Sequence, residues 1–511
     1  ADPPVHTAAD LQNDPRLVAL LLGNIHAGEC AGKEAILALL RDLSRRDPQG
    51  LLKHFVIIAV PNFNADGNEQ QGTQHRPGQL GPSEGMGLRE NSQGLDLNRD
   101  FIKLESPEVR SLTQFIHQWK PHLFIDTHTT NGSKHRYHLT YDIPHNPAAP
   151  APVRKWLRED LLPRVTRELL TKDINTFFYG NFNKDHTRWT TYGHEPRYST
   201  EYFGLRGGLS ILAEAYSYVS YEKRVDSHYQ FISSVLGQVS TDTNFARQLV
   251  QNGGTFEGDL SIRAKNTAYP DKINVAGYHL AKKPLPNQPG PASSTAIPQD
   301  YSVDYHANYK TTLSVSRPYA YLLAHQEARA AARLLMHGIQ VHQLQQPQTF
   351  PFNRQSITKI QSLPGTVGGQ RLTSLTTKDS EVSETVPAGT FVIFSEQPLS
   401  RLATYLLEPR SDDGLTAWNF FRHALRKGSF HPVSRVLQPT KLVTVPLNTV
   451  PRNSQLSLDR IYGPQGRVPF GGSFPLSLRW LPKTDSYKLR KATVNYHVSA
   501  ETGARSPVAG P

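Results

Sequence analysis

Four residues of this chain have side chains that can bind a metal or move a proton, and each follows an apolar run. His26 and Glu29, three residues apart, come directly after one run, His128 ends a second, and Glu214 follows a third. Two histidines with one carboxylate make the ligand set of a catalytic zinc site that keeps an open fourth position. The second carboxylate is then free to act as a base. This joint pattern predicts a zinc site, although His-x-x-Glu alone is weak.

The apolar runs are the elements that must position these residues. Continuous apolar sequence predicts strands buried on both faces at 17–25, 51–60, 122–128 and 209–218, the second of them stopped by Pro61. In open α/β sheets, ligands bind beyond the carboxyl ends of the strands. We therefore expect the four residues to meet at one edge of a sheet.

Stretches with apolar residues at helical spacing alternate with the strands, which predicts a mostly parallel, mixed α/β sheet flanked by helices. Ser106 is the expected N-cap of one helix, with Pro107 at its first position. The long segment 141–208 otherwise has loop character. The predicted helices are 32–47, 106–119, one near 156–170, and 224–251.

A change in composition near residue 256 predicts a second domain. We divide the chain into a catalytic domain at 1–255, a strand-rich α+β domain at 256–450 and a tail at 451–511. Alternating sequence at 367–395 is typical of half-exposed strands, and the proline-rich 284–298 predicts a linker. Short helices are predicted within 327–338 and 398–407.

Composition excludes several classes of protein. The single cysteine, Cys30, excludes an internal disulfide and a cysteine-cluster metal site, so any metal must be bound by histidines and carboxylates. The net charge is +12, but no nucleic-acid-binding motif occurs, so we expect a solvated basic surface and no nucleic-acid partner. No apolar run approaches the roughly 20 residues of a membrane span. The first ten residues, ADPPVHTAAD, contain no signal-peptide pattern.

Five segments resemble the zinc carboxypeptidase family, the relatives of carboxypeptidases A and B. In order they are GNIHAGECAG, VPNFNADGNE, LRENSQGLDLNRDF, FIDTHTTNG and ILAEAYSY, and their order and spacing agree over 17–250. The resemblance implies the family's fold and a peptide or peptide-like substrate with a free C-terminal carboxylate. It also favours a secreted or periplasmic location. It says nothing of the oligomeric state, the side-chain preference or the role of the second domain.

The resemblance implies that Zn²⁺ is bound by His26, Glu29 and His128, with Glu214 as the general base. Only 25 residues precede His26, fewer than the family's opening strands require, so the sheet edge is expected to be incomplete or built differently. The same shortage suggests that the chain is a piece of a longer protein.

The substrate-binding residues are also implied by the resemblance. Arg89 matches the arginine that polarises the scissile carbonyl, and Asn98 and Arg99 match the pair that binds the terminal carboxylate. The planar guanidinium of Arg99 suits bidentate binding of a carboxylate. Asp96 matches the acceptor that orients a zinc-bound histidine.

This sequence departs from the family at two places. Asp100 stands where the family usually has asparagine, so the local hydrogen bonding is expected to differ. The family's mobile tyrosine has three candidates, Tyr192, Tyr198 and Tyr202, and we assign Tyr192 because it lies 22 residues before Glu214. Two arginines of the same segment, 197 and 206, are interpreted as solvated loop residues.

The tail has a second resemblance. Residues 454–503 look like the opening blade of a dipeptidyl-aminopeptidase propeller of the prolyl oligopeptidase family. A single blade cannot bury its apolar face, and no Ser-His-Asp site follows. We infer a remnant without serine-protease activity.

Two alternatives to a metallocarboxypeptidase remain open from the sequence. An aspartoacylase-like zinc amidohydrolase uses a related ligand triad, but the long insertion at 129–208 disfavours it. A non-catalytic binding protein, with or without zinc, is the other alternative. Comparing the cleavage of peptides with that of N-acyl amino acids distinguishes the amidohydrolase from a carboxypeptidase. Metal analysis of the purified protein distinguishes the binding protein from a zinc enzyme.

Overall fold

The computed structural model describes residues 3–448, apart from 48, 80, 83, 131 and 284–292. The predicted tail at 451–511, with its propeller resemblance, lies outside these residues. We call residues 3–255 the first region and residues 256–448 the second region.

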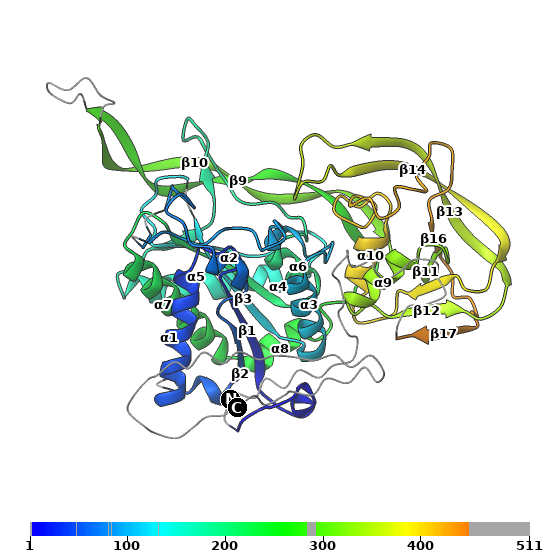
Figure 1. Cartoon of the computed structure of the whole chain (residues 1–511), viewed down its shortest axis with the longest axis horizontal. Coiled ribbons are helices and arrows are strands. Elements are labelled where there is room, and N and C mark those ends of the chain that lie inside the picture. The colour runs from blue at the N-terminus through cyan, green and yellow to red at the C-terminus, as the bar shows by residue number, and fades with distance from the viewer. Residues whose placement is uncertain are drawn as a thin grey trace, which may run out of the picture. The chain divides into compact units, whose positions relative to one another are not determined.

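A six-stranded mixed sheet forms the centre of the first region, in the order β2-β1-β3-β8-β4-β5 (Figure 1). The first four of these strands are parallel to one another, and β4 runs antiparallel to β8. The predicted α/β fold class and all four predicted strands are confirmed. The strands are β1 (Leu17–Gly23), β2 (Phe55–Val60), β3 (Leu123–Thr130), β4 (Leu139–Asp142), β5 (Thr176–Phe178) and β8 (Leu209–Tyr216).

Helices cover both faces of this sheet, as continuous apolar strands require. Alternate residues of β1 enter two apolar clusters. Leu17, Ala19 and Leu21 pack with residues of α1 and α7, while Leu20 and Leu22 pack with residues of α3. The helices are α1 (Ala31–Arg45), α2 (Ala65–Glu69), α3 (Pro107–Trp119), α4 (Ala151–Trp156), α5 (Leu162–Leu170), α6 (Ser199–Leu205), α7 (Tyr221–Ser240) and α8 (Thr243–Gln251).

The helix predictions succeed where capping residues mark the ends. The side chain of Ser106 accepts a hydrogen bond from Val109 N at the start of α3, as predicted. The helix predicted at 224–251 is divided into α7 and α8, because Asp242 caps a new helix by accepting from Phe245 N. Helix α6 lies within the segment expected to be a loop, so that part of the prediction was wrong.

The second region is built on a seven-stranded sheet, in the order β14-β13-β16-β11-β15-β12-β17. The predicted short helices are present as α9 (Ala328–Met336) and α10 (Ser400–Leu407). The strands are β11 (Ala320–Leu323), β12 (Val341–Leu344), β13 (Gln348–Ser362), β14 (Thr373–Val386), β15 (Phe391–Phe394), β16 (Val433–Val436) and β17 (Thr444–Leu447).

A long antiparallel hairpin, β9 (Asp259–Lys283) and β10 (Ser293–Ser316), precedes this sheet (Figure 1). Its strand β10 pairs with β7 (Arg188–Thr190), and β7 in turn pairs with β6 (Asn181–Phe182) of the first region. The predicted linker is therefore wrong over 293–298, which belong to β10.

The two regions share apolar packing. One cluster of buried residues contains Phe124 and Tyr202 of the first region together with Tyr321 and Leu402 of the second. The domain boundary at 255 stays a prediction.

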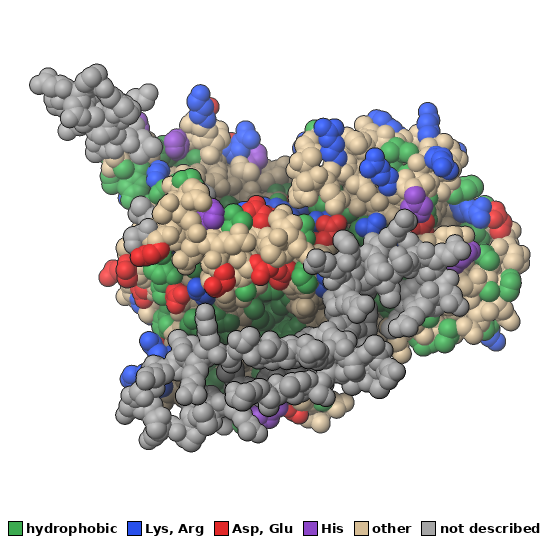
Figure 2. Space-filling model, viewed as in Figure 1, with side chains coloured by type: hydrophobic (Ala, Val, Ile, Leu, Met, Phe, Trp, Pro, Cys, Tyr) green, Lys and Arg blue, Asp and Glu red, His purple; other side chains and the backbone are tan. Residues whose placement is uncertain are grey.

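None of the described helices has the length and apolar character needed to cross a bilayer. On the face shown in Figure 2, several basic side chains lie over β13–β14, and acidic ones lie mostly over the first region.

Helix α1 approaches β3 closely at Gly32. A Cβ atom at position 32 would lie 2.0 Å from Thr127 Oγ1. We expect Gly32→Ala to destabilise the fold by about 1–3 kcal/mol, since overpacking outweighs the better helix propensity of alanine. Thermal or denaturant unfolding measures this effect.

Gly237→Ala within α7 is the matched control. Its Cβ would meet only Gln49 Oε1, at 3.3 Å, so this change should leave stability unchanged or raise it by up to about 1 kcal/mol. Equal stability of the two variants would contradict the close approach of α1 and β3.

Candidate metal centre and active site

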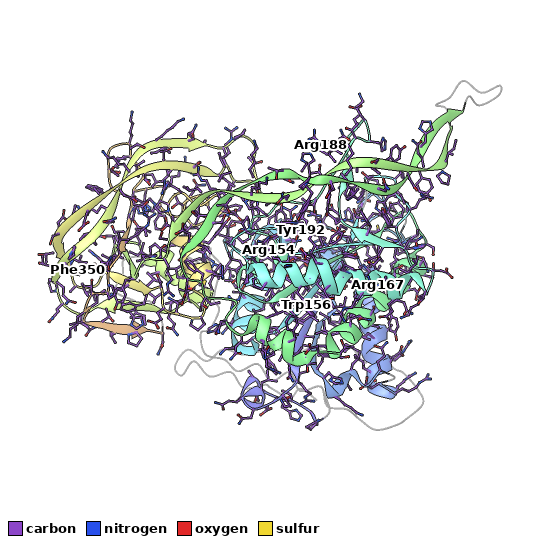
Figure 3. All side chains as sticks on the ribbon, turned by 180° about the vertical axis from the view of Figure 1, so that it is seen from behind. Arg154, Trp156, Arg167, Arg188, Tyr192 and Phe350 are labelled. Carbon is purple, nitrogen blue, oxygen red and sulfur yellow. The ribbon has the colours of Figure 1, made fainter. Side chains whose placement is uncertain are left out.

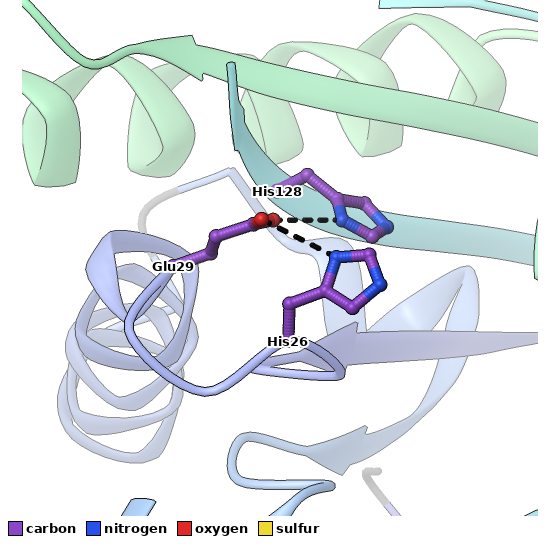
Figure 4. A group of neighbouring side chains, drawn as sticks. All are labelled: His26, Glu29 and His128. Atoms are coloured by element: carbon purple, nitrogen blue, oxygen red, sulfur yellow. Dashed lines mark hydrogen bonds and ion pairs between the residues drawn. The ribbon is translucent and has the colours of Figure 1, made fainter. Parts of the chain in front are cut away.

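The side chains of His26, Glu29 and His128 come together in a buried cluster (Figure 4). One ligand atom from each lies within 4.8 Å of the others. His128 Nδ1 is 2.9 Å from Glu29 Oε2, and His26 Nδ1 is 3.3 Å from Glu29 Oε1. The three side chains that the sequence analysis assigned to zinc therefore face one another.

Two local structures bring these side chains together. His26 and Glu29 lie on the loop between β1 and α1, where Glu29 N donates to His26 O at 3.0 Å. Gly28 makes this loop possible, because its φ is +94° and a Cβ would lie 2.9 Å from Gly87 O. His128 is near the end of β3, the strand beside β1 in the sheet.

The outer ring nitrogens of both histidines face aspartates. His26 Nε2 lies 3.1 Å from Asp96 Oδ1, and His128 Nε2 lies 3.0 Å from Asp126 Oδ2. Metal-binding histidines commonly present one nitrogen to the metal and the other to a carboxylate. In the tautomer with the proton at Nε2, the Nδ1 lone pairs face Glu29, an arrangement that a bound cation or a further proton would stabilise. The residues therefore fit a bound Zn²⁺.

The charges of the cluster point the same way. Burial opposes ionisation of Glu29, yet Arg76 and His26 hold the pKa of this carboxyl well below its ordinary value. Burial likewise opposes the charged form of His128, but Asp126 and Glu29 raise the pKa of this imidazole well above its ordinary value. The surrounding carboxylates thus favour positive charge between the histidines and Glu29.

Glu214 lies next to the cluster on β8. It is the register partner of His128 in the parallel β3–β8 pair, so the two side chains point to the same face of the sheet. Burial raises the pKa of Glu214 to about 8, although nearby His128 opposes this shift. A carboxyl with a pKa near neutral beside a metal cluster is suited to proton transfer.

Arg89, Asn98 and Arg99 lie around Asp96. Arg89 Nη2 is 2.9 Å from Asp96 Oδ2, and Arg89 Nη1 is 3.7 Å from Glu29 Oε1. Asn98 and Arg99 belong to a short 3-10 turn, Leu97–Arg99, which Asp96 caps by accepting from Asn98 N. These predicted site residues are therefore held close to the metal cluster by one aspartate.

The three candidate tyrosines have different surroundings. The hydroxyl of Tyr192 donates to Ile143 O at 3.0 Å, and the residue lies between α4 and the hairpin (Figure 3). Tyr202 is buried, with its hydroxyl 2.9 Å from His337 Nδ1. The ring of Tyr198 lies 4.4 Å from the guanidinium carbon of Arg99. Of the three, Tyr198 is therefore the one in contact with a predicted substrate-binding residue.

The sequence analysis missed two residues that touch the ligands. Arg76 donates to Glu29 Oε1, and it comes from the loop after α2. Asp126 faces His128 and also accepts from the hydroxyl of Ser199. Asp126 precedes His128 by two residues on a strand and so shares its face of the sheet, a signal the sequence did contain.

Two further expectations can be compared with the structure. Asp100, the departure from the family, accepts hydrogen bonds from Glu105 N and from the backbone and hydroxyl of Ser106, so it anchors the start of α3. The interpretation of Arg197 as solvated was wrong, because it is only 5% exposed and pairs with Asp413. A partner more than two hundred residues away leaves no local signal in the sequence.

Comparison with known proteins agrees with this geometry. Residues 5–159, which include all three proposed ligands, match the zinc carboxypeptidase family. Over these residues the chain is similar to a zinc carboxypeptidase domain. Members of this family are metallopeptidases and therefore hydrolases, so the domain is that of an enzyme. Glu214 lies beyond the matched residues.

Individual relatives of the zinc carboxypeptidase domain are distant. Carboxypeptidase 2 of Trichophyton tonsurans is 21% identical over 82% of this chain and 77% of its own length. Carboxypeptidase D of Homo sapiens is 34% identical over 20% of this chain and 8% of its own length. A metallo-carboxypeptidase structure from Burkholderia cenocepacia has 18% identity and a TM-score of 0.34, and the match covers 45% of this chain and 59% of that one.

The orientation of His26 by Asp96 leads to a prediction about metal affinity. We expect Asp96→Asn to weaken zinc binding by about 10- to 100-fold, because the amide no longer fixes the imidazole as a carboxylate does. Competition with a chromophoric chelator measures the affinity. Asp271→Asn, on an exposed part of β9, is the matched control and should bind zinc like the unaltered chain. Unchanged affinity in Asp96→Asn would contradict the assignment.

Proposed function

We propose that this chain is a zinc metallocarboxypeptidase that hydrolyses the C-terminal peptide bond of peptides. The observation that carries the proposal is the convergence of His26, Glu29 and His128, with Glu214 beside them on the neighbouring strand. Bound zinc would supply a Lewis acid for the scissile carbonyl and lower the pKa of a water molecule toward about 7. The remaining steps belong to side chains of this chain.

Asn98 and Arg99 are proposed to bind the terminal carboxylate of the substrate. The guanidinium of Arg99 is partly exposed and lies against the ring of Tyr198, which limits its conformations. Its planar pair of N–H groups can donate two parallel hydrogen bonds to a carboxylate. The amide nitrogen of Asn98 is available to add a third donor, because its Oδ1 accepts from Ser199 N at 2.8 Å.

Arg89 and Glu214 are proposed to act on the scissile bond. Arg89 keeps a fixed positive charge beside the ligand Glu29, where the carbonyl oxygen gains negative charge as the bond is attacked. Glu214 takes a proton from the attacking water and passes it to the leaving amine. Asp96 holds both Arg89 and His26, so it orients one group for the oxyanion and one for the metal.

Paired peptides test the proposed function. We expect the zinc-loaded chain to release the last residue from peptides with a free C-terminus and to leave the same peptides with an amidated C-terminus intact. Mass spectrometry detects the released residue, and a chelator should abolish the release. Cleavage of N-acyl amino acids in place of peptides, or of the amidated peptides at internal bonds, would contradict the proposal.

Glu214→Gln tests the role of the general base. We expect this change to lower kcat by about 10²- to 10⁴-fold while zinc remains bound, because the amide cannot accept the proton. Activity and metal content are measured on the same preparation. Glu222→Gln, at an exposed position of α7, is the control and should keep full activity. An active Glu214→Gln variant with zinc bound would exclude the assigned mechanism.

A further inference from the structure

The segment 194–199 packs directly against the turn that carries Asn98 and Arg99. Ser199 N donates to Asn98 Oδ1 at 2.8 Å, and Phe101 N donates to the carbonyl oxygen of Arg197 at 3.4 Å. On the same segment, Tyr198 lies against the guanidinium of Arg99. The position of the proposed carboxylate-binding pair is thus tied to this segment by three contacts.

The opposite side of the segment is held by two adjacent acids of the second region. Arg197 Nη2 lies 2.9 Å from Asp413 Oδ1, and Arg197 N donates to Asp413 Oδ2 at 2.9 Å. His194 Nε2 lies 2.9 Å from Asp412 Oδ2. Both acids follow α10, far from residue 194 in the sequence. The segment therefore bridges the proposed substrate-binding turn and the second region.

The two acids are themselves fixed from several directions. Trp418 Nε1 donates to Asp413 Oδ1 at 2.9 Å. Asp412 accepts from the hydroxyl of Tyr405 and from Ala264 N, the latter on β9. Hydrogen bonds from α10, from β9 and from the turn at Trp418 hold the two carboxylates in place, so they can act as rigid anchors.

Burial makes these contacts specific. Asp413 is fully buried, Arg197 is 5% exposed and His194 is 7% exposed. Burial raises the pKa of Asp413 to about 7, against the effect of Arg197, while Asp412 raises the pKa of His194 to about 9 despite burial. A buried ion pair adds little net stability compared with a well-packed pair of apolar side chains. Loss of one partner is strongly destabilising, however, because it leaves the other charge buried and unpaired. Such pairs therefore define position more than they stabilise the fold.

We infer that Asp412 and Asp413 are positioning residues, which hold the Asn98–Arg99 turn in register with the metal centre through the segment 194–199. The inference rests on the proposed function, since it assigns the turn to the substrate carboxylate. It gives the second region a part in substrate recognition. A shift of about 1 Å in a substrate-positioning group can reduce activity 10²-fold. An anchor that fixes the position of the Asn98–Arg99 turn can therefore affect activity without touching the substrate.

Arg197→Lys is the variant that tests the inference, because it keeps the charge and loses the planar contact with Asp413. We expect KM for a peptide with a free C-terminus to rise by about 10- to 100-fold, with kcat and zinc content nearly unchanged. Hydrogen exchange of the Ser199 amide should also become faster, since its bond to Asn98 loosens. Asp413→Asn should also raise KM and speed the exchange of the Ser199 amide. If Asp413→Asn fails to fold, Arg197→Lys alone provides the test.

Arg401→Lys is the matched control. Arg401 also joins the two regions, by donating to Ala148 O and Gly253 O at 2.8 and 2.9 Å, but it does not touch the segment. It should lower stability without changing KM or the exchange of Ser199. An equal rise of KM in this control, or an unchanged KM and Ser199 exchange in Arg197→Lys, would overturn the inference. If the unaltered chain releases no C-terminal residue, the proposed function fails, and the exchange comparison still decides the positioning role.

Discussion

The central constraint on this structure is the meeting of two imidazoles and one carboxylate at a buried point of the fold. These three residues, His26, Glu29 and His128, are each less than 5% exposed. The Nε2 atoms of the two histidines face the carboxylates of Asp96 and Asp126. This arrangement concentrates carboxylate charge around the two imidazoles, which a bound cation would offset. The proximity of β1 and β3, the glycine at position 28 and the capping of the Leu97–Arg99 turn all serve to maintain it.

Local signals in the sequence were sufficient for the centre of the fold. Continuous apolar runs identified the four parallel strands, and Ser106 with Pro107 marked the start of α3, because burial and capping act over a few residues. The same strands then predicted that the four metal and base candidates would share one edge, and the structure does bring them together. The resemblance to a family added Arg89, Asp96, Asn98 and Arg99, which lie around the cluster.

The features that the sequence did not reveal depend on contacts between distant parts of the chain. The hairpin strand β10 includes a proline-rich stretch that is typical of a linker, and pairing with β9 and β7 overrides that local preference. Arg76 reaches Glu29 from a loop without regular structure. Arg197 finds its partner in Asp413, and no spacing rule connects the two. Contacts between residues so far apart in the sequence can be identified only once the fold is known.

The pairing of β10 with β7 also bears on how such a chain could change over time. Trp189 of β7 is buried in an apolar cluster with Val275, Val303 and Tyr305, all of which come from the hairpin. Loss of the second region together with its hairpin would leave that tryptophan and the edge of β7 in water. Substitutions in either region at this shared surface are therefore constrained by the side chains of the other region.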